Sequence, residues 1–239
     1  MCIAINAPKG TSPTKGALET SFIYNSDGCG YCFAKDGKLI IKKGFFDFES
    51  FLKSYQKDNI QGVNKLIHFR ISTSGKINKL NCHPFLITDE LAMIHNGVIP
   101  HFGNKIENDT LQFVKLILRP IIVANGVKSL LNPSIQKMLI ESIGNSKLAF
   151  LDNEGNSHII NEKLGHRYNS IWYSNETYKE KNSFSYYGEE FIYDESKCTE
   201  CFTVLKNGEY DVCDYCIEDS ESGVDGWGKK FKSYYKGIA

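Results

Sequence analysis

The sequence lacks an excess of either charge, because 28 lysines and arginines balance 28 aspartates and glutamates. The overall charge therefore does not favour nucleic acid or an anionic membrane as a partner, although a local patch can lie within a neutral total. No apolar run approaches the roughly 18 residues that a membrane span needs, and the amino-terminal residues lack the charged and apolar regions of a signal peptide. We therefore expect a cytoplasmic protein without a membrane partner.

Internal repeats and long low-complexity tracts are also absent. The length of 239 residues suffices for one large domain, or for one domain with a small appendage. The composition changes after about Asn182, where tyrosine, glutamate, serine and cysteine become frequent. We place a boundary near residue 190, which gives a main domain over residues 2–190 and a small module over residues 191–239.

Cys2 directly follows Met1 in a hydrophobic opening segment. Removal of Met1 would place an α-amine with a pKa of about 8 and a thiol with a pKa of about 8.5 on one residue. The amine could then accept the thiol proton, directly or through a water, without a histidine or aspartate partner. The alternative is a small apolar residue at the start of the first strand.

The hydrophobic pattern predicts strands that flank a cluster of helices. We expect strands over residues 2–6, 29–34, 38–42, 66–72, 91–95, 148–151, 157–160 and 171–174. We expect helices over residues 48–57 and 133–143, and a third that begins at Asn108-Asp109-Thr110 and is kinked or divided at Pro120. This order favours an α+β fold with packed sheets and outer helices over an alternating parallel chain.

Four separated segments carry chemically suggestive residues in a fixed order. They are Cys2, His68-Phe69-Arg70-Ile71-Ser72-Thr73-Ser74-Gly75, His83-Pro84-Phe85 followed by His95-Asn96-Gly97, and Asn108-Asp109-Thr110. In this order, over roughly residues 2–175, the chain resembles the class II glutamine amidotransferase domain, a member of the amino-terminal nucleophile hydrolases. The resemblance implies a four-layer α/β/β/α sandwich and the hydrolysis of L-glutamine to glutamate and ammonia.

The resemblance also implies catalytic roles for three of these residues. Cys2 would attack the side-chain carboxamide of glutamine and form a γ-glutamyl thioester that water resolves. The Asn96 side-chain amide and the Gly97 backbone N–H would bind the developing oxyanion. Considered alone, Asn-Gly is equally the commonest tight hairpin turn.

Three further residues would bind the substrate. Arg70 would hold the α-carboxylate of glutamine through paired hydrogen bonds, Asp109 would accept the α-ammonium, and Thr73 would support the carboxylate or its loop. An arginine is otherwise most often a surface ion-pair partner, and Asp109 is equally compatible with an ordinary helix N-cap. Asn108 could provide that cap while Asp109 binds substrate.

Three histidines and the first Cys-x-x-Cys pair are more simply explained as parts of the fold than as catalytic or metal-binding residues. His68, His83 and His95 have no helical metal-binding spacing, and an amino-terminal cysteine needs no imidazole base, so we expect them to order loops. Cys29 and Cys32 lie three residues apart on a predicted strand and should therefore point to opposite faces of the sheet.

Four cysteines near the carboxyl end form two Cys-x-x-Cys pairs, Cys198/Cys201 and Cys213/Cys216. A predicted β-hairpin lies between them, and this arrangement predicts one structural Zn²⁺ ion with four thiolate ligands in a small zinc ribbon. The alternative is two labile dithiols. A short basic and aromatic stretch over residues 227–235 is compatible with nucleic-acid binding, although a solvated terminal helix is the simpler interpretation.

We therefore predict a glutaminase subunit that needs no cofactor for catalysis. The roughly 60 residues after the glutaminase region are too few for a synthase domain, so the ammonia acceptor would be a separate protein. One alternative is an amidohydrolase that acts on another γ-glutamyl or related amide. Another is a non-catalytic binding protein that acts through the zinc ribbon.

Overall fold

The computed structural model describes residues 2–58 and 60–179, which all belong to one compact unit, Met1–Lys181. The predicted boundary near residue 190, the four predicted zinc ligands and the basic stretch lie outside the described residues. Within the described ranges, no helix has the length and apolar character needed to cross a bilayer.

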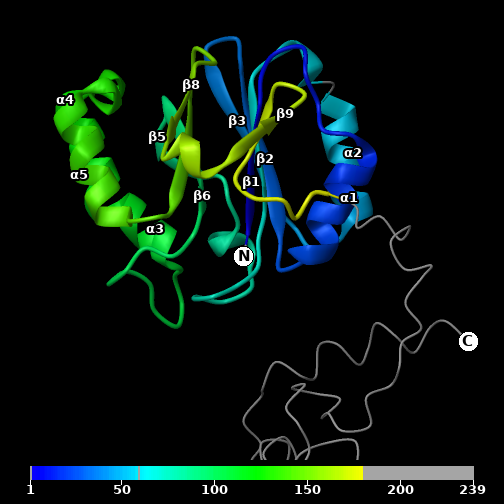
Figure 1. The fold of residues 1–239 in the computed structure, drawn as a ribbon, viewed down its shortest axis with the longest axis horizontal. Coiled ribbons are helices and arrows are strands. Elements are labelled where there is room, and N and C mark those ends of the chain that lie inside the picture. The colour runs from blue at the N-terminus through cyan, green and yellow to red at the C-terminus, as the bar shows by residue number, and fades with distance from the viewer. Residues whose placement is uncertain (1, 59, 180–239) are drawn as a thin grey trace, which may run out of the picture. The chain divides into compact units, whose positions relative to one another are not determined.

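The described residues form two antiparallel sheets (Figure 1). The larger has the strand order β3-β2-β4-β1-β10-β9, and the smaller has the order β5-β6-β7-β8. The strands of the larger sheet are β1 (Ile3–Ala7), β2 (Cys29–Lys35), β3 (Lys38–Phe45), β4 (Lys65–Phe69), β9 (His166–Tyr168) and β10 (Ile171–Tyr173). Those of the smaller sheet are β5 (Phe85–Thr88), β6 (Leu91–Asn96), β7 (Lys147–Asp152) and β8 (Ser157–Ile160).

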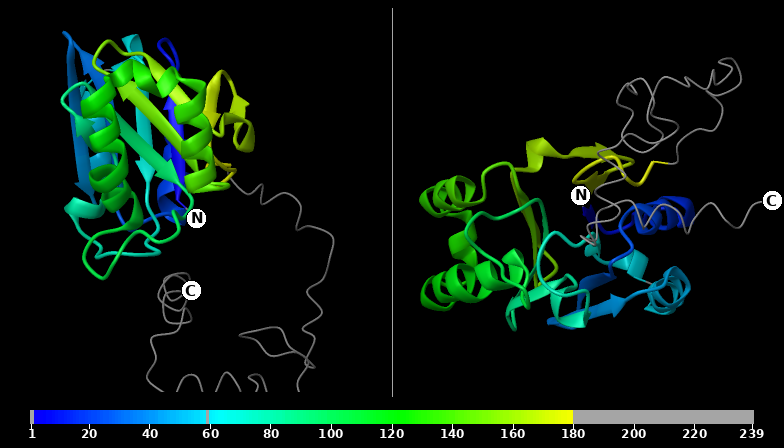
Figure 2. Two further views of the ribbon diagram at one scale, coloured as in Figure 1. Left: turned by 90° about the vertical axis from the view of Figure 1, so that its left-hand side faces the viewer. Right: turned by 90° about the horizontal axis from the view of Figure 1, so that it is seen from below.

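Helices cover the outer face of each sheet (Figures 1 and 2). Helices α1 (Lys15–Tyr24) and α2 (Phe48–Asp58) lie against the larger sheet. Helices α3 (Asp109–Phe113), α4 (Arg119–Asn125) and α5 (Pro133–Ile143) lie against the smaller sheet, with a π-helical segment, Val114–Leu118, between α3 and α4. Short 3₁₀ turns occupy Ile60–Gly62, Lys79–Asn81, Val127–Leu131 and Glu162–Leu164.

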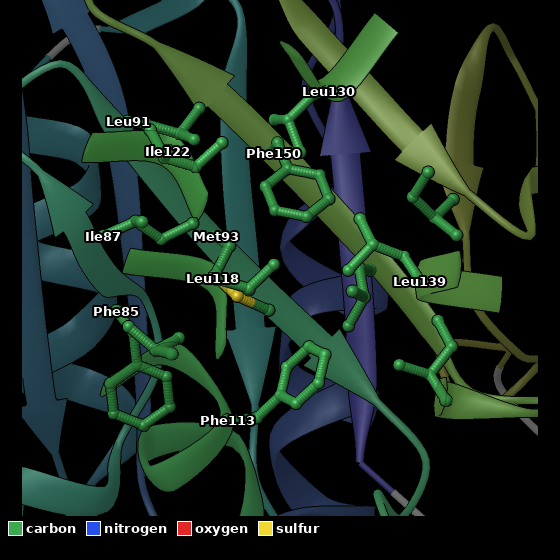
Figure 3. Close-up of a cluster of buried hydrophobic side chains, with 14 of the residues drawn as sticks. Phe85, Ile87, Leu91, Met93, Phe113, Leu118, Ile122, Leu130, Leu139 and Phe150 are labelled. Atoms are coloured by element: carbon green, nitrogen blue, oxygen red, sulfur yellow. The ribbon is translucent and has the colours of Figure 1, made fainter. Parts of the chain in front are cut away.

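Three clusters of buried apolar side chains join these elements. One lies between α1, α2 and the larger sheet and includes Leu18, Phe51 and Phe69. Figure 3 shows the second, in which side chains of the smaller sheet pack against the helices α3 to α5. The third joins the two sheets and includes Ala4 and Ala92. Alternation of side chains along each strand produces this division, because successive residues face opposite sides.

Most of the predicted elements are present. α5 has the predicted bounds, and the helix that starts near Asn108 is divided as predicted, by the π-helical segment that directly precedes α4 and its Pro120. Cys29 and Cys32 lie on opposite faces of β2, since one belongs to the cluster beneath the helices and the other to the cluster between the sheets. That prediction is confirmed.

Three elements were not predicted. The buried residues of α1 include Thr20 and Ser21 beside Leu18, so its apolar pattern is weak. β5 has only four residues, one of which is the exposed Leu86. β9 is the polar segment His166–Tyr168, and it is a strand because it pairs with β10. Packing or strand pairing with distant segments therefore decides these three elements, which the local sequence pattern does not predict.

Candidate active site

Cys2 lies at the beginning of β1, where the backbone that follows β4 holds its thiol. The antiparallel pairing of Ile3 with Phe69 brings the two segments together. The Cys2 Sγ atom donates to the Ile71 carbonyl over 3.2 Å and accepts from the Ile71 N–H over 3.3 Å. The thiol is therefore held by both backbone polar groups of one residue, Ile71.

The carbonyl group of Cys2 is held by two asparagine side chains. Asn96 Nδ2 donates to this oxygen over 2.5 Å and Asn175 Nδ2 donates over 2.7 Å. Asn96 ends β6 in the smaller sheet, whereas Asn175 follows β10 in the larger one. Both sheets thus anchor the backbone of Cys2. Sequence reasoning did not identify Asn175, and only the pairing of β1 with β10 reveals its position.

Asn96 and Gly97 do not form the tight hairpin that the dipeptide also allowed. Asn96 is the last residue of β6 and Gly97 follows it, and the next strand of that sheet, β7, starts only at Lys147. Gly97 has a φ of 138°, and a Cβ atom at this position would lie 2.2 Å from Ser146 Oγ. The backbone can therefore take this path only with glycine.

Arg70 is buried, with 2% of its surface exposed. Its guanidinium group donates to Ser72 Oγ over 2.9 Å, to the Ser74 carbonyl over 2.7 Å and to the Lys76 carbonyl over 3.3 Å. The ordinary interpretation of an exposed surface arginine is therefore wrong. Because guanidinium carries five N–H donors, it retains capacity for a further acceptor.

Asn108 and Asp109 divide their roles at the start of α3. Asn108 Oδ1 accepts from the Leu111 N–H over 2.8 Å, so Asn108 is the N-cap, as the sequence suggested. One carboxylate oxygen of Asp109 accepts from the Ile99 N–H and the other from the Thr110 N–H, each over 2.8 Å. Asp109 therefore anchors the segment that follows Gly97.

One cavity is lined by the residues predicted for the glutamine site, with the exception of Asn96. Its lining includes Cys2, Arg70, Thr73, Gly97 and Asp109. Residues not predicted for a site also line it, namely Ile71, Ser74, His83, His95, Asn108 and Thr110. The loops that follow β4 and β6 meet here, near the amino terminus (Figure 1). The structure therefore joins segments that are far apart in the sequence.

The environment of Cys2 has opposing effects on its thiol. Burial raises the pKa of the thiol, whereas the Ile71 N–H and the positive charge of Arg70 act against that increase. A thiolate in this pocket would therefore depend on the Ile71 N–H and on nearby positive charge.

Three buried histidines lie beside this cavity. His68 Nε2 is 2.8 Å from the His95 carbonyl, which connects β4 to β6 across the two sheets. His95 Nδ1 is 2.8 Å from Thr110 Oγ1, and the rings of His68 and His83 have centroids 4.0 Å apart. Burial lowers the pKa of His68 to about 3 and that of His95 to about 4, and it lowers the pKa of His83 well below its usual value. All three imidazoles are therefore neutral near pH 7.

The described residues contain no group of three or more His, Cys, Asp or Glu side chains arranged to hold a metal ion. The predicted zinc ligands Cys198, Cys201, Cys213 and Cys216 lie outside the described ranges, so this finding does not concern them.

Comparison with known proteins shows local sequence similarity. No family model matches the chain. Over 80 residues, 33% of this chain and 13% of the relative, it is 32% identical to glutamine–fructose-6-phosphate aminotransferase (isomerizing) of Pyrococcus horikoshii. It is 34% identical over 69 residues, 28% of this chain and 12% of the relative, to the protein of the same name from Pyrobaculum aerophilum. The chain therefore matches only a small part of the length of these curated relatives.

Among solved structures, the glutamine phosphoribosylpyrophosphate amidotransferase of B. subtilis, in complex with ADP and GMP, aligns with 72% of this chain and 41% of that chain. The sequence identity is 14% and the TM-score is 0.47. The chain is thus distantly similar, over about a third of its length, to two proteins named glutamine–fructose-6-phosphate aminotransferase.

Proposed function

We propose that this protein is a glutamine amidotransferase subunit of the amino-terminal nucleophile class, which hydrolyses L-glutamine to glutamate and ammonia. The observation that carries the proposal is the convergence of the Cys2 thiol, the Arg70 guanidinium group and the Asp109 carboxylate on one cavity. The local similarity to glutamine-dependent enzymes supports the same class. The two sheets and their outer helices would correspond to the α/β/β/α sandwich of that class.

The reaction would begin with removal of Met1, which leaves the α-amine on Cys2 itself. The amine accepts the thiol proton, and the Ile71 N–H, which already donates to Sγ, stabilises the thiolate. Sγ then attacks the side-chain carbonyl carbon of glutamine. The oxyanion receives the second N–H of the Asn96 amide and the Gly97 N–H, donors that preorganised sites use for such charge.

Collapse of this intermediate breaks the C–N bond, and ammonia leaves with the proton held by the α-ammonium. The resulting γ-glutamyl thioester is cleaved by water, which returns the proton to Sγ and releases glutamate. No cofactor takes part in these steps. The ammonia would pass to an acceptor enzyme on a separate chain.

Recognition of a free amino acid would use the charged residues of the cavity. Arg70 would bind the α-carboxylate through a charge-assisted hydrogen bond from its remaining N–H donors, since Nη2 already donates to Ser72 and Ser74. Asp109 would accept the α-ammonium through Oδ2, which keeps a lone pair beyond its bond from the Ile99 N–H, whereas Oδ1 already accepts from the N–H and the hydroxyl of Thr110. Thr73, on the exposed side of the cavity, would support the carboxylate.

The decisive test measures glutamate release by the purified protein together with its intact mass. We expect turnover of glutamine, a mass without Met1, and a covalent adduct with a chloroketone analogue of glutamine. The Cys2→Ala variant should lose turnover and adduct while it stays folded. Retention of Met1, or the absence of both turnover and adduct in the wild type, would contradict the proposal.

We also propose that Cys198, Cys201, Cys213 and Cys216 bind one structural Zn²⁺ ion. Four thiolates complete a tetrahedral zinc site, so this metal would have no open position for catalysis. Reduced thiols fit the proposed cytoplasmic location. Metal analysis should find equimolar zinc in the wild type and little in Cys213→Ser, whereas Cys82→Ser should keep the metal. Zinc-free wild type would contradict this assignment.

A further inference from the structure

The side-chain amide of Asn96 has a second hydrogen-bond partner on the neighbouring strand. Its Nδ2 atom donates to the Cys2 carbonyl over 2.5 Å, and its Oδ1 atom accepts from the ammonium group of Lys147 over 3.5 Å. The second contact is long, as hydrogen bonds in an active site without substrate often are. Asn96 is buried, and Lys147 is the only donor to Oδ1 within the part of the chain that the structure describes. The amide is therefore held at both ends.

The register of the smaller sheet brings Lys147 to this position. Asn96 at the end of β6 pairs directly with Lys147 at the start of β7, and residues directly opposite in an antiparallel pair have neighbouring side chains on one face. The next residues on that face of β7, Ala149 and Leu151, belong to the cluster between the two sheets. Lys147 therefore lies at the edge of this apolar layer, on the face of the smaller sheet that is directed at the larger one.

No ion pair within the described residues accounts for a lysine at this position. The side chain is half-buried, and burial lowers the pKa of its ammonium group. A charged group that is partly withdrawn from water is costly to the fold unless it is hydrogen-bonded. The carboxamide oxygen of Asn96 supplies this hydrogen bond.

The two partners of Asn96 decide which end of its amide faces Cys2. An ammonium group can only donate, and a backbone carbonyl can only accept. The amide oxygen therefore faces Lys147, and the NH₂ group faces the Cys2 carbonyl. A half-turn of the amide would place oxygen against the carbonyl and NH₂ against the ammonium, so both contacts would become repulsive. Lys147 thus opposes the orientation in which Asn96 could not donate toward Cys2.

We propose that Lys147 is a positioning residue of the oxyanion hole, which fixes the Asn96 amide in its donating orientation and polarises it. The inference rests on the proposed function, in which the second N–H of this amide binds the oxyanion. Hydrogen bonds in a chain polarise one another, so a positive charge at Oδ1 makes the N–H groups stronger donors. Because the oxyanion forms only after substrate has bound, Lys147 contributes to kcat and not to KM.

The test is a double-mutant cycle on glutamine hydrolysis. Lys147→Met keeps the length of the side chain but removes its donors and charge, and kcat should fall about tenfold with KM within about twofold. In the Asn96→Ala background the same substitution should lower kcat by less than about twofold, because no amide is left to position. Lys147→Arg should keep most of kcat, since guanidinium is also a charged donor. Lys42→Met removes another half-buried lysine, on β3, and should change neither constant.

Equal losses of kcat in the two backgrounds would show that Lys147 acts independently of Asn96 and would overturn the inference. An unchanged kcat in Lys147→Met, a loss confined to KM, or an equally large loss in Lys147→Arg would also overturn it. If Lys147→Met fails to fold, Lys147→Val takes its place with the same expected result, because a β-branched residue suits a strand. A wild type that does not hydrolyse glutamine would instead contradict the proposed function.

Discussion

The two ends of the β1–β4 ladder bury polar groups in opposite ways. At one end, where Ala7 pairs with Lys65, the lysine side chain is completely buried. Its ammonium group donates to the Thr11 carbonyl over 2.5 Å and to the Ile60 carbonyl over 3.0 Å. Its polar atom is therefore satisfied within the protein, and Lys65 ties two loops to the sheet.

At the other end, where Ile3 pairs with Phe69, the buried polar groups are satisfied only in part. Cys2 and Arg70 bind backbone there, while ring nitrogens of His83 and His95 have no partner in the described residues. A fold that only needs stability pairs such groups, because orphaned ones are costly. The comparison distinguishes a structural end of the sheet from an end that we call the reserved end, which under the proposed function would bind the ligand.

The largest effect should come from Asn96→Ala at the reserved end. Loss of an oxyanion donor typically lowers kcat about 100- to 1000-fold, and we expect this drop in glutamine hydrolysis with a smaller change in KM. Asn175→Ala is the matched control, since it removes the other amide from the same Cys2 carbonyl. It should lower kcat much less. Equal losses in the two variants would mean that both residues only anchor Cys2.

Arg70→Lys tests whether this end binds a carboxylate. A lysine cannot reproduce the paired hydrogen bonds of guanidinium, and the loss of one charge-assisted hydrogen bond should raise KM for glutamine about 10- to 100-fold. Steady-state kinetics should show a smaller change in kcat. Arg119→Lys, at an arginine whose Nε donates to the Ile87 carbonyl, should leave KM unchanged. A lower kcat with an unchanged KM would contradict the role of Arg70.

Acid should destabilise the end that holds the histidines. Burial lowers the pKa of His68 to about 3 and that of His95 to about 4, whereas the unfolded residues titrate near about 6.5. Between these values only the unfolded chain binds the protons, so the free energy of unfolding should fall as the pH decreases below about 6.5, by roughly 1.4 kcal/mol per pH unit for each histidine.

Urea unfolding at several pH values measures this slope. His83→Phe should show a shallower slope than the wild type, because one buried neutral imidazole is gone. A free energy of unfolding that stays constant between pH values of about 7 and 5 would contradict the burial of neutral histidines.

The smallest effect should come from Lys65→Met at the structural end. The variant leaves two carbonyl groups unpaired but removes a buried charge, so we expect a net loss of about 1 kcal/mol in the free energy of unfolding. The kinetic constants for glutamine should not change, because Lys65 does not line the cavity. A folded Lys65→Met variant with impaired kcat or KM would contradict the assignment of a purely structural role to this end of the sheet.

Local sequence pattern predicted the features that depend on neighbours in the chain. The bounds of α5, the division of the helix at Pro120 and the Asn108 cap all follow from helix signals within a few residues. The opposite faces of Cys29 and Cys32 follow from strand geometry. The helix α1 and the strand β9 escaped prediction, because their patterns are weak and packing or pairing with other segments decides them.

The sequence by itself determined which residue types the proposed chemistry would use and in what order they occur, from Cys2 through Arg70 and Asn96 to Asp109. Only the tertiary structure decided that Asn175 holds the Cys2 carbonyl and that His83 and His95 line the same cavity. The physical reason is distance along the chain. The sequence gives each side chain's identity directly. The pairing of β1 with β10 and the packing of the two sheets, in contrast, depend on contacts between segments up to about 170 residues apart.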